Sequence, residues 1–172
     1  GLDLSADWKG FDFRAFFQGV MKRDYWPTTR NSYFWGATCE NVWYAVGFKQ
    51  HLDYYRAEPY YGLDTNIDSY YPRPLQGNSK NVQKQTRYLQ DASYIRLKNL
   101  QIGYTLPSNL TSRFGIAKLR VFFSGENLWT GTKLPDMLDP ETIFGGVSTG
   151  AGLNGQAYPI SKSLSVGVNV TL

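Results

Sequence analysis

The last ten residues of the chain alternate between apolar and polar side chains. In the terminal stretch SKSLSVGVNVTL, the positions Ser165, Gly167, Asn169 and Thr171 are small or polar, and every residue between them is apolar. A period of two predicts a β-strand with one apolar face, here over residues 163–172. An exposed edge strand usually stops short or carries charge, so an apolar final residue is unusual. The predicted apolar face consists of Leu164, Val166, Val168, Val170 and Leu172.

The first twenty residues predict a β-hairpin. Apolar residues alternate over 2–8 and again over 11–21, and their parity flips across Lys9-Gly10. A two-residue turn there would place Trp8 opposite Phe11 and would gather the apolar side chains on one face. The same register puts Asp7 opposite Asp12, which indicates a second face that water reaches, or a slightly longer turn. Because alternation already runs at Leu2, we expect the chain to be a fragment of a longer protein.

Two further strands are expected in the second half of the chain, over residues 93–106 and 117–129. In the first of them the apolar parity changes at Lys98-Asn99, which predicts a β-bulge. Pro107 ends this strand, and a compact turn leads into the next one. The terminal strand completes a set of five.

The connections between these strands alternate in length. The Lys9-Gly10 turn and the 107–116 turn are short, whereas residues 25–91 and 131–160 form long loops. Strands of about ten residues with short turns at one end and long loops at the other are typical of outer-membrane β-barrels. A soluble β-sandwich would explain the alternation too, but not the one-sided loop lengths. The pattern favours the barrel and leaves the sandwich open.

Composition and single residues exclude several classes of function. No apolar run approaches the length of a transmembrane helix. The net charge is +4, but Lys and Arg are scattered, so we expect no nucleic-acid partner. The chain has one cysteine, Cys39, and one histidine, His51. No nucleophile, base and acid occur together in a recognisable catalytic set. We therefore expect neither an enzyme nor a metal site nor a cofactor.

Aromatic residues make up 16% of the chain, and over half of them fall in the loop 25–91. A loop of this length is usually functional. Most of its aromatic residues would pack the loop's own core, and a few would stack on a ligand, supported by Asp53, Arg56 and Arg73. The expected ligand-binding residues are Trp26, Trp35, Trp43, Tyr54 and Tyr55.

Three stretches in order along the chain carry a family resemblance. DASYIRLKNLQIGYTLP, then LRVFFSGENLWT, then YPISKSLSVGVNVTL strongly resemble the C-terminal end of the SusC/RagA-type TonB-dependent outer-membrane transporters. WKGFDFRAFFQGVMKRDYWP, GFKQHLDYY and YPRP resemble the preceding strands and long loop of the same family. The resemblance covers essentially the whole chain. Leu172 stands where such proteins often end in Phe, a departure that keeps the position apolar.

The resemblance implies an all-β fold: the C-terminal antiparallel strands of a large transmembrane β-barrel with long extracellular loops. Five strands cannot close a barrel in lipid, so the remainder of the same barrel would be a partner. The C-terminus of such barrels is periplasmic, so the short turns would face the periplasm and the loops 25–91 and 131–160 the outside. Trp8, Phe11 and Tyr104 would then form a periplasmic aromatic girdle, and the apolar face of strand 163–172 would contact outer-membrane lipid.

The function implied by the resemblance is import across the outer membrane of a Gram-negative bacterium. The substrates would be glycans, oligosaccharides or peptides, TonB would supply the energy through a part of the protein outside this chain, and a SusD-like surface lipoprotein would be a partner. Two alternatives stay open: a SusC-like barrel that serves as a scaffold for outer-membrane assembly or secretion, and a soluble β-sandwich module that binds glycans.

Overall fold

The computed structural model describes residues 1–39, 45–76, 80–143 and 160–172. The chain divides into two compact units. The first, called the sheet unit here, comprises Gly1–Met21, Ser93–Thr132 and Ile160–Leu172, and the second, the loop unit, comprises Lys22–Ala92 and Lys133–Pro159. Among the described residues, no helix has the length and apolar character needed to cross a membrane.

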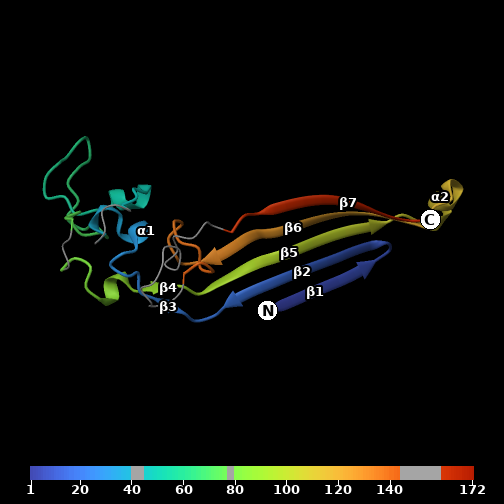
Figure 1. Ribbon diagram of the computed structural model, residues 1–172, viewed down its shortest axis with the longest axis horizontal. Helices are drawn as coiled ribbons and strands as arrows, with labels where there is room; N and C mark the ends of the chain where they lie inside the picture. Colours follow the sequence, from blue (N-terminus) through green and yellow to red (C-terminus); the bar gives the residue numbers. More distant parts are fainter. Residues whose placement is uncertain (40–44, 77–79, 144–159) are drawn as a thin grey trace. The chain divides into compact units, whose positions relative to one another are not determined.

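The sheet unit is built on one antiparallel sheet of five strands in the order β1-β2-β5-β6-β7, drawn side by side in Figure 1. Each connection within the sheet joins neighbours, so the strands run alternately up and down. The observed bounds differ from the expected ones by at most three residues. The strands are β1 (Leu2–Trp8), β2 (Phe11–Val20), β5 (Tyr94–Thr105), β6 (Lys118–Thr132) and β7 (Ser163–Thr171).

The register of the sheet confirms two predictions made from the sequence. Trp8 lies opposite Phe11, as the two-residue turn requires, and the turn itself uses positive φ angles at Lys9 and Gly10. The register shifts in the pairing of β5 with both β2 and β6, and in each case it passes from Leu97 directly to Asn99. This is the bulge expected at Lys98-Asn99, and it moves the apolar set of β5 to the opposite parity.

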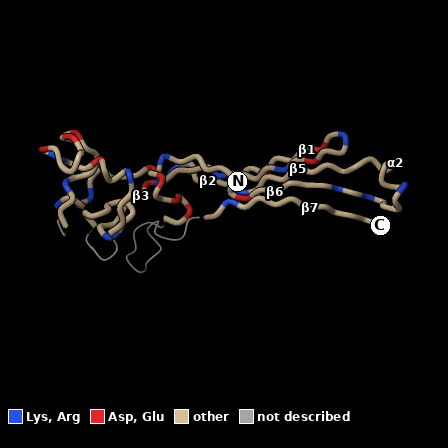
Figure 2. The backbone as a smooth tube through the Cα atoms, turned by 90° about the horizontal axis from the view of Figure 1, so that it is seen from above, with Lys and Arg blue, Asp and Glu red and all other residues tan. Residues whose placement is uncertain are grey.

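The two faces of the sheet have opposite chemical character. Because paired residues of neighbouring strands lie on the same face, the register assigns each paired strand position to one of two faces. One face, called the apolar face here, carries the aliphatic and aromatic side chains of all five strands. The other, the polar face, carries charged, hydroxyl and amide side chains, with Phe16, Val20, Tyr94 and Phe122 among them. Figure 2 shows that β7 contributes no charged residue to either face.

The short connections and the end of β7 lie at one end of the sheet (Figure 1). Between β5 and β6 the chain forms helix α2 (Ser108–Thr111) and a 3-10 turn (Ser112–Phe114) that ends at Gly115 with φ +70°. The backbone N–H of Ala117 donates to the carbonyl of Thr171 at 2.8 Å, so β6 and β7 are paired up to this turn. Both long connections leave the sheet at its other end.

The loop unit has its own core of aromatic residues. Its described residues include the two-residue strands β3 (Asp24–Tyr25) and β4 (Gln90–Asp91), helix α1 (Ser32–Trp35) and the 3-10 turns Gly36–Thr38, Lys49–Leu52 and Thr86–Tyr88. Asn31 caps α1, because its side chain accepts from the backbone N–H of Phe34 at 3.0 Å. The core side chains include Tyr25, Phe34, Trp35, Cys39, Tyr71, Val82, Tyr88, Ala92, Leu134, Leu138 and Ile143.

Candidate functional site

The apolar face of the sheet has no side chains of the sheet unit packed over it. Large hydrophobic residues are exposed there on every strand, from Leu4 on β1 to Val168 on β7. A soluble protein rarely exposes so continuous an apolar surface unless something covers it. Of the residues expected to face lipid, Leu164, Val166, Val168 and Val170 lie on this face. Leu172 follows the end of β7 and is exposed.

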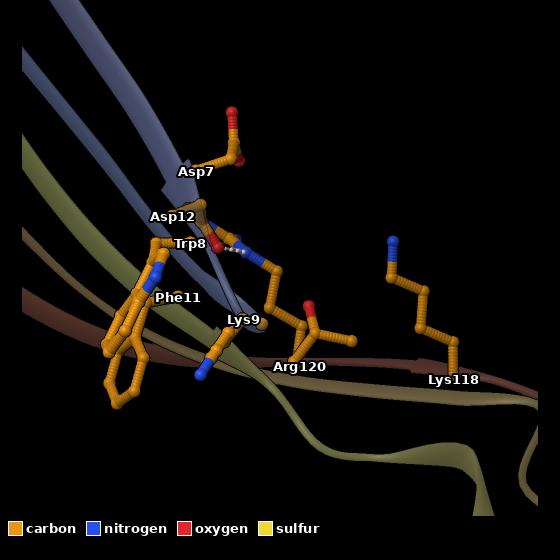
Figure 3. A pocket seen from close by; sticks show the side chains of 9 residues that line it. Asp7, Trp8, Lys9, Phe11, Asp12, Lys118 and Arg120 are labelled. Carbon is orange, nitrogen blue, oxygen red and sulfur yellow. Dashed lines mark hydrogen bonds and ion pairs between the residues drawn. The ribbon is translucent and has the colours of Figure 1, made fainter.

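The expected girdle residues come together at the short-turn end of the apolar face. The rings of Phe11 and Tyr104 lie with their centroids 4.5 Å apart, on directly paired positions of β2 and β5. Trp8 pairs with Phe11 from the other side, and Figure 3 shows the two side chains next to each other. The Lys9 ammonium lies 5.2 Å from the centre of the Trp8 ring. Aromatic rings flanked by a cation at one end of an apolar band suit a membrane–water interface.

On the polar face, Asp12 of β2 and Arg120 of β6 form an ion pair that crosses β5 (Figure 3). The guanidinium donates twice, and its Nε lies 2.8 Å from Asp12 Oδ2. The side chains are only 30% and 17% exposed, so water screens this pair less than a surface pair. Arg120 reaches Asp12 only because the residue between them on β5 is Gly103, where a Cβ would collide with both partners.

A second glycine on the same face accommodates an aromatic ring. The ring of Phe122 lies against Gly167, its register partner on β7, and an added Cβ there would meet the ring at less than contact distance. The Arg120 guanidinium lies 4.9 Å from the centre of the same ring. The side chains of Asp12, Arg120 and Phe122 therefore pack over Gly103 and Gly167 in one continuous strip across the four strands β2, β5, β6 and β7.

The expected Asp7–Asp12 juxtaposition is present in the register. Its cost is reduced because Arg120 neutralises Asp12, a partner 108 residues away that sequence reasoning did not identify. A cavity of about 420 Å³ opens beside this pair and is also lined by Lys9 and Lys118. In Figure 3 the Lys9 side chain points downward and the Lys118 side chain upward, with their ammonium groups well apart in that view.

The structure separates the expected ligand-binding residues of the loop unit. Trp35 is only 2% exposed, and its indole N–H donates to the carbonyl of Thr28 at 2.9 Å. Trp26 packs against the same core, with its ring centroid 6.2 Å from that of Trp35. Trp35 is therefore a core residue with no surface for a ligand ring, which corrects its expected role. Trp43 lies outside the described residues.

Tyr54 and Tyr55 lie instead at a pocket of the loop unit. The pocket has a volume of about 570 Å³ and is formed by the segments 54–60 and 73–75. Tyr54 is partly buried against the core, whereas Tyr55 and Tyr60 are exposed. Arg73, which sequence reasoning set beside the aromatic residues, also lines this pocket. Volumes of ~300–1,000 Å³ are usual for small-ligand sites.

Arg56 and Asp53 hold the frame of this pocket. The Arg56 guanidinium donates to the carbonyls of Leu52 at 2.7 Å and Asp64 at 2.8 Å, and lies 4.5 Å from the centre of the Tyr54 ring. The Asp53 carboxylate accepts from the Asn66 side chain at 2.7 Å. These two residues, expected to support a ligand, are therefore engaged in shaping the loop.

His51 connects the 3-10 turn beside the pocket to helix α1. Its Nδ1 accepts from the backbone N–H of Phe48 at 3.1 Å, and its Nε2 lies 3.0 Å from the carbonyl of Tyr33, so the neutral tautomer with the proton on Nε2 satisfies both. Burial lowers the pKa of His51, against the opposing effect of hydrogen bonds to the backbone of Tyr33, Phe34 and Val46. These hydrogen bonds give the imidazole a structural role in the loop unit.

Comparisons with known proteins agree with this architecture. No family model matches the chain. It is 34% identical over 111 residues to TonB-dependent receptor P3 of Formosa agariphila, which covers 62% of this chain and 11% of that receptor. It is 28% identical over 178 aligned positions to TonB-dependent receptor P26 of the same organism, covering 99% of this chain and 16% of the receptor.

Solved structures show the same fold. The structure of the RagAB peptide transporter matches 98% of this chain with a TM-score of 0.63 and 25% identity, over 16% of the matched chain. The RagAB peptide importer in the open-open state matches 99% of this chain with a TM-score of 0.55 and 22% identity. The chain thus spans 11–16% of the length of the relatives it matches. The expected fold class, antiparallel strands of a large β-barrel, is confirmed.

Proposed function

We propose that this chain, whose sequence and fold are those of the SusC/RagA-type TonB-dependent receptors, forms part of the wall and loops of an outer-membrane importer. The observation that carries the proposal is the contrast between the two faces of the sheet. One face exposes aliphatic and aromatic residues on all five strands, and the other carries charged and amide side chains. This is the arrangement that a wall between lipid and a polar interior requires.

The orientation follows from the aromatic end of the sheet. Trp8, Phe11 and Tyr104 would mark the periplasmic interface, together with the short turns, and the loop unit would belong to the outer side. The edges β1 and β7 have no further partner within the described residues, so each would pair with another strand of the same barrel. In this setting β7 is an interior strand of a closed wall.

Import of glycans, oligosaccharides or peptides, energised by TonB and assisted by a SusD-like surface lipoprotein, is the activity we assign to the whole receptor. The loop unit supports this assignment, since it combines a rigid aromatic core with a pocket that opens beside exposed tyrosines. A preformed core keeps such a pocket in shape and lowers the entropic cost of ligand binding.

Uptake by a strain that lacks the gene tests the proposal. We expect the deletion strain to lose growth on the nutrient that the receptor imports, tested as peptide mixtures and as oligosaccharides, and the wild-type gene to restore it only when TonB is functional. Growth unaffected on both nutrient classes, with loss of a surface protein assembly, would favour a scaffold. Recovery of the isolated chain as a monodisperse soluble domain would contradict the barrel itself.

A further inference from the structure

The pocket formed by residues 54–60 and 73–75 is a candidate ligand site whose lining indicates a ligand class. Its walls combine the exposed rings of Tyr55 and Tyr60 with the apolar Pro59, Pro74 and Leu75. Flat aromatic and prolyl surfaces of this kind bind other flat or apolar groups with little loss of side-chain freedom. The pocket therefore offers an apolar platform, and its charged groups decide which ligand fits.

Two charged side chains of opposite sign line the pocket and lack a partner. Within the described part of the chain, neither the Arg73 guanidinium nor the Glu58 carboxylate makes a hydrogen bond or an ion pair, although both residues line the pocket. Arg56 differs from Arg73 in this respect, because backbone carbonyls occupy its guanidinium. The loop structure thus uses Arg56 and leaves Arg73 and Glu58 available.

The fold holds these two charges on separate backbone segments. Tyr54 and Tyr71 form a β-bridge, and Arg56 exchanges backbone hydrogen bonds with Asn66 at 2.8 and 2.9 Å. These contacts hold the start of the 54–60 segment against the chain that follows it, residues 66–71. Arg73 comes two residues after Tyr71, on the second segment that lines the pocket. A ligand that lies across the platform would meet a carboxylate on one segment and a guanidinium on the other.

We infer that this pocket binds a short peptide with free termini, whose carboxylate pairs with Arg73, whose ammonium pairs with Glu58 and whose side chains pack on Tyr55 and Tyr60. A guanidinium pairs well with a carboxylate because its N–H groups match the two oxygens. An acidic oligosaccharide would offer a partner to Arg73 but would be repelled by Glu58, so the pair of opposite charges favours the zwitterion. The inference rests on the proposed function and specifies its ligand class.

Binding to the purified full-length receptor tests the inference. The probe is the tripeptide Ala-Ala-Phe with free termini, compared with its C-terminal amide, its N-acetyl form and a trigalacturonate, by isothermal titration calorimetry in detergent. We expect the wild type to bind the free tripeptide about tenfold more tightly than either blocked form, because each blocked form lacks one of the two charged termini and its hydrogen bonds.

The variants assign each terminus to its partner. Arg73→Gln should weaken binding of the free tripeptide about tenfold and leave binding of the C-terminal amide unchanged. Glu58→Gln should also weaken binding of the free tripeptide about tenfold, and it should leave binding of the N-acetyl form unchanged. The matched control is Arg113→Gln, an exposed arginine of the sheet unit, which should bind as the wild type does.

Several outcomes would overturn the inference. These are no binding of the tripeptide by the wild type, equal affinities of Arg73→Gln and Arg113→Gln, or binding of trigalacturonate in preference to the tripeptide. If the receptor still supports TonB-dependent growth in those cases, the importer function stands and only this pocket's role is wrong. Loss of growth dependence on the gene would instead contradict the proposed function.

Discussion

The Asp12 carboxylate on β2 and the Arg120 guanidinium on β6 pair across the intervening strand, above the bare backbone of Gly103. This pair links the second strand of the sheet to the fourth. Because Arg120 neutralises Asp12, it also weakens the repulsion between Asp7 and Asp12, which are register partners. Position 103 therefore needs a glycine, because a side chain there would collide with both Asp12 and Arg120.

Gly103→Ala should destabilise the sheet. The new Cβ would occupy the space through which Arg120 reaches Asp12, so one or both hydrogen bonds would be lost. Because the pair is partly exposed, we expect a loss of about 1 kcal/mol. Heat-modifiable migration of the full-length receptor on a gel should show unfolding at a lower temperature. Gly47→Ala, where nothing lies within 4 Å of the added Cβ, is the control, and equal unfolding temperatures would contradict the account.

Gly167→Ala should also destabilise the sheet, but for a steric reason. The ring of Phe122 covers Gly167, and no Cβ fits beneath it without moving the ring. The double variant Phe122→Ala with Gly167→Ala should lose less stability than the sum of the two single variants, since the two residues are in contact. Additive effects of the two substitutions on the unfolding temperature would show that the ring does not lie on this glycine.

Val168→Arg should impair assembly of the barrel. Val168 lies on the apolar face opposite Val121, and a basic residue costs ~2–4 kcal/mol near the middle of a bilayer. Ser165→Asn on the same strand should be tolerated, because Ser165 lies on the polar face opposite Ser124. The measurement is the amount of heat-modifiable receptor in outer membranes. Unchanged migration of Val168→Arg would mean that this parity does not face lipid.

Acid should loosen the loop unit around His51. Burial lowers the pKa of His51, so the folded state favours the neutral ring that accepts from the N–H of Phe48. Below the ordinary value of 6.5, the unfolded segment takes up a proton before the folded one does. The stability that this side chain contributes is therefore fully present above that pH and declines as pH falls below it.

Hydrogen exchange measures this effect directly. Amides of the Lys49–Leu52 turn should exchange faster at pH 5.5 than at pH 7.5 once intrinsic rates are corrected. His51→Gln keeps a donor and an acceptor but does not titrate, so its exchange should not depend on pH in this range. An equal pH dependence in wild type and variant would assign the effect to another group.

The sequence predicted those parts of the fold that depend on local pattern. The Trp8–Phe11 register and the Lys98 bulge follow from parity and turn length, because a one-residue slip would move every apolar side chain to the wrong face. Strand β6 extends to Thr132, three residues beyond the expected end at 129, because Thr130 and Gly131 pair with β5 without an apolar alternation to mark them.

What depends on distant contacts was not predictable from one sequence. Nothing local distinguishes Trp35, which became a core residue, from Tyr55, which is exposed at the pocket. The Asp12–Arg120 pair joins residues 108 positions apart. The observed register contains the missing signal, a glycine on β5 opposite Asp12, but the pairing of β2 with β5 was itself not among the predictions.

The central claim is that the sheet separates lipid from a polar interior, and site-directed spin labelling of β7 tests it most directly. Single cysteines would replace residues 164–171 in turn, in a Cys39→Ala background of the full-length receptor in outer-membrane lipid. The account predicts alternation with a period of two. Labels at Val166, Val168 and Val170 should collide mainly with oxygen, and labels at Ser165, Asn169 and Thr171 with a water-soluble nickel reagent. Uniform accessibility along β7, or alternation in the opposite phase, would contradict the account.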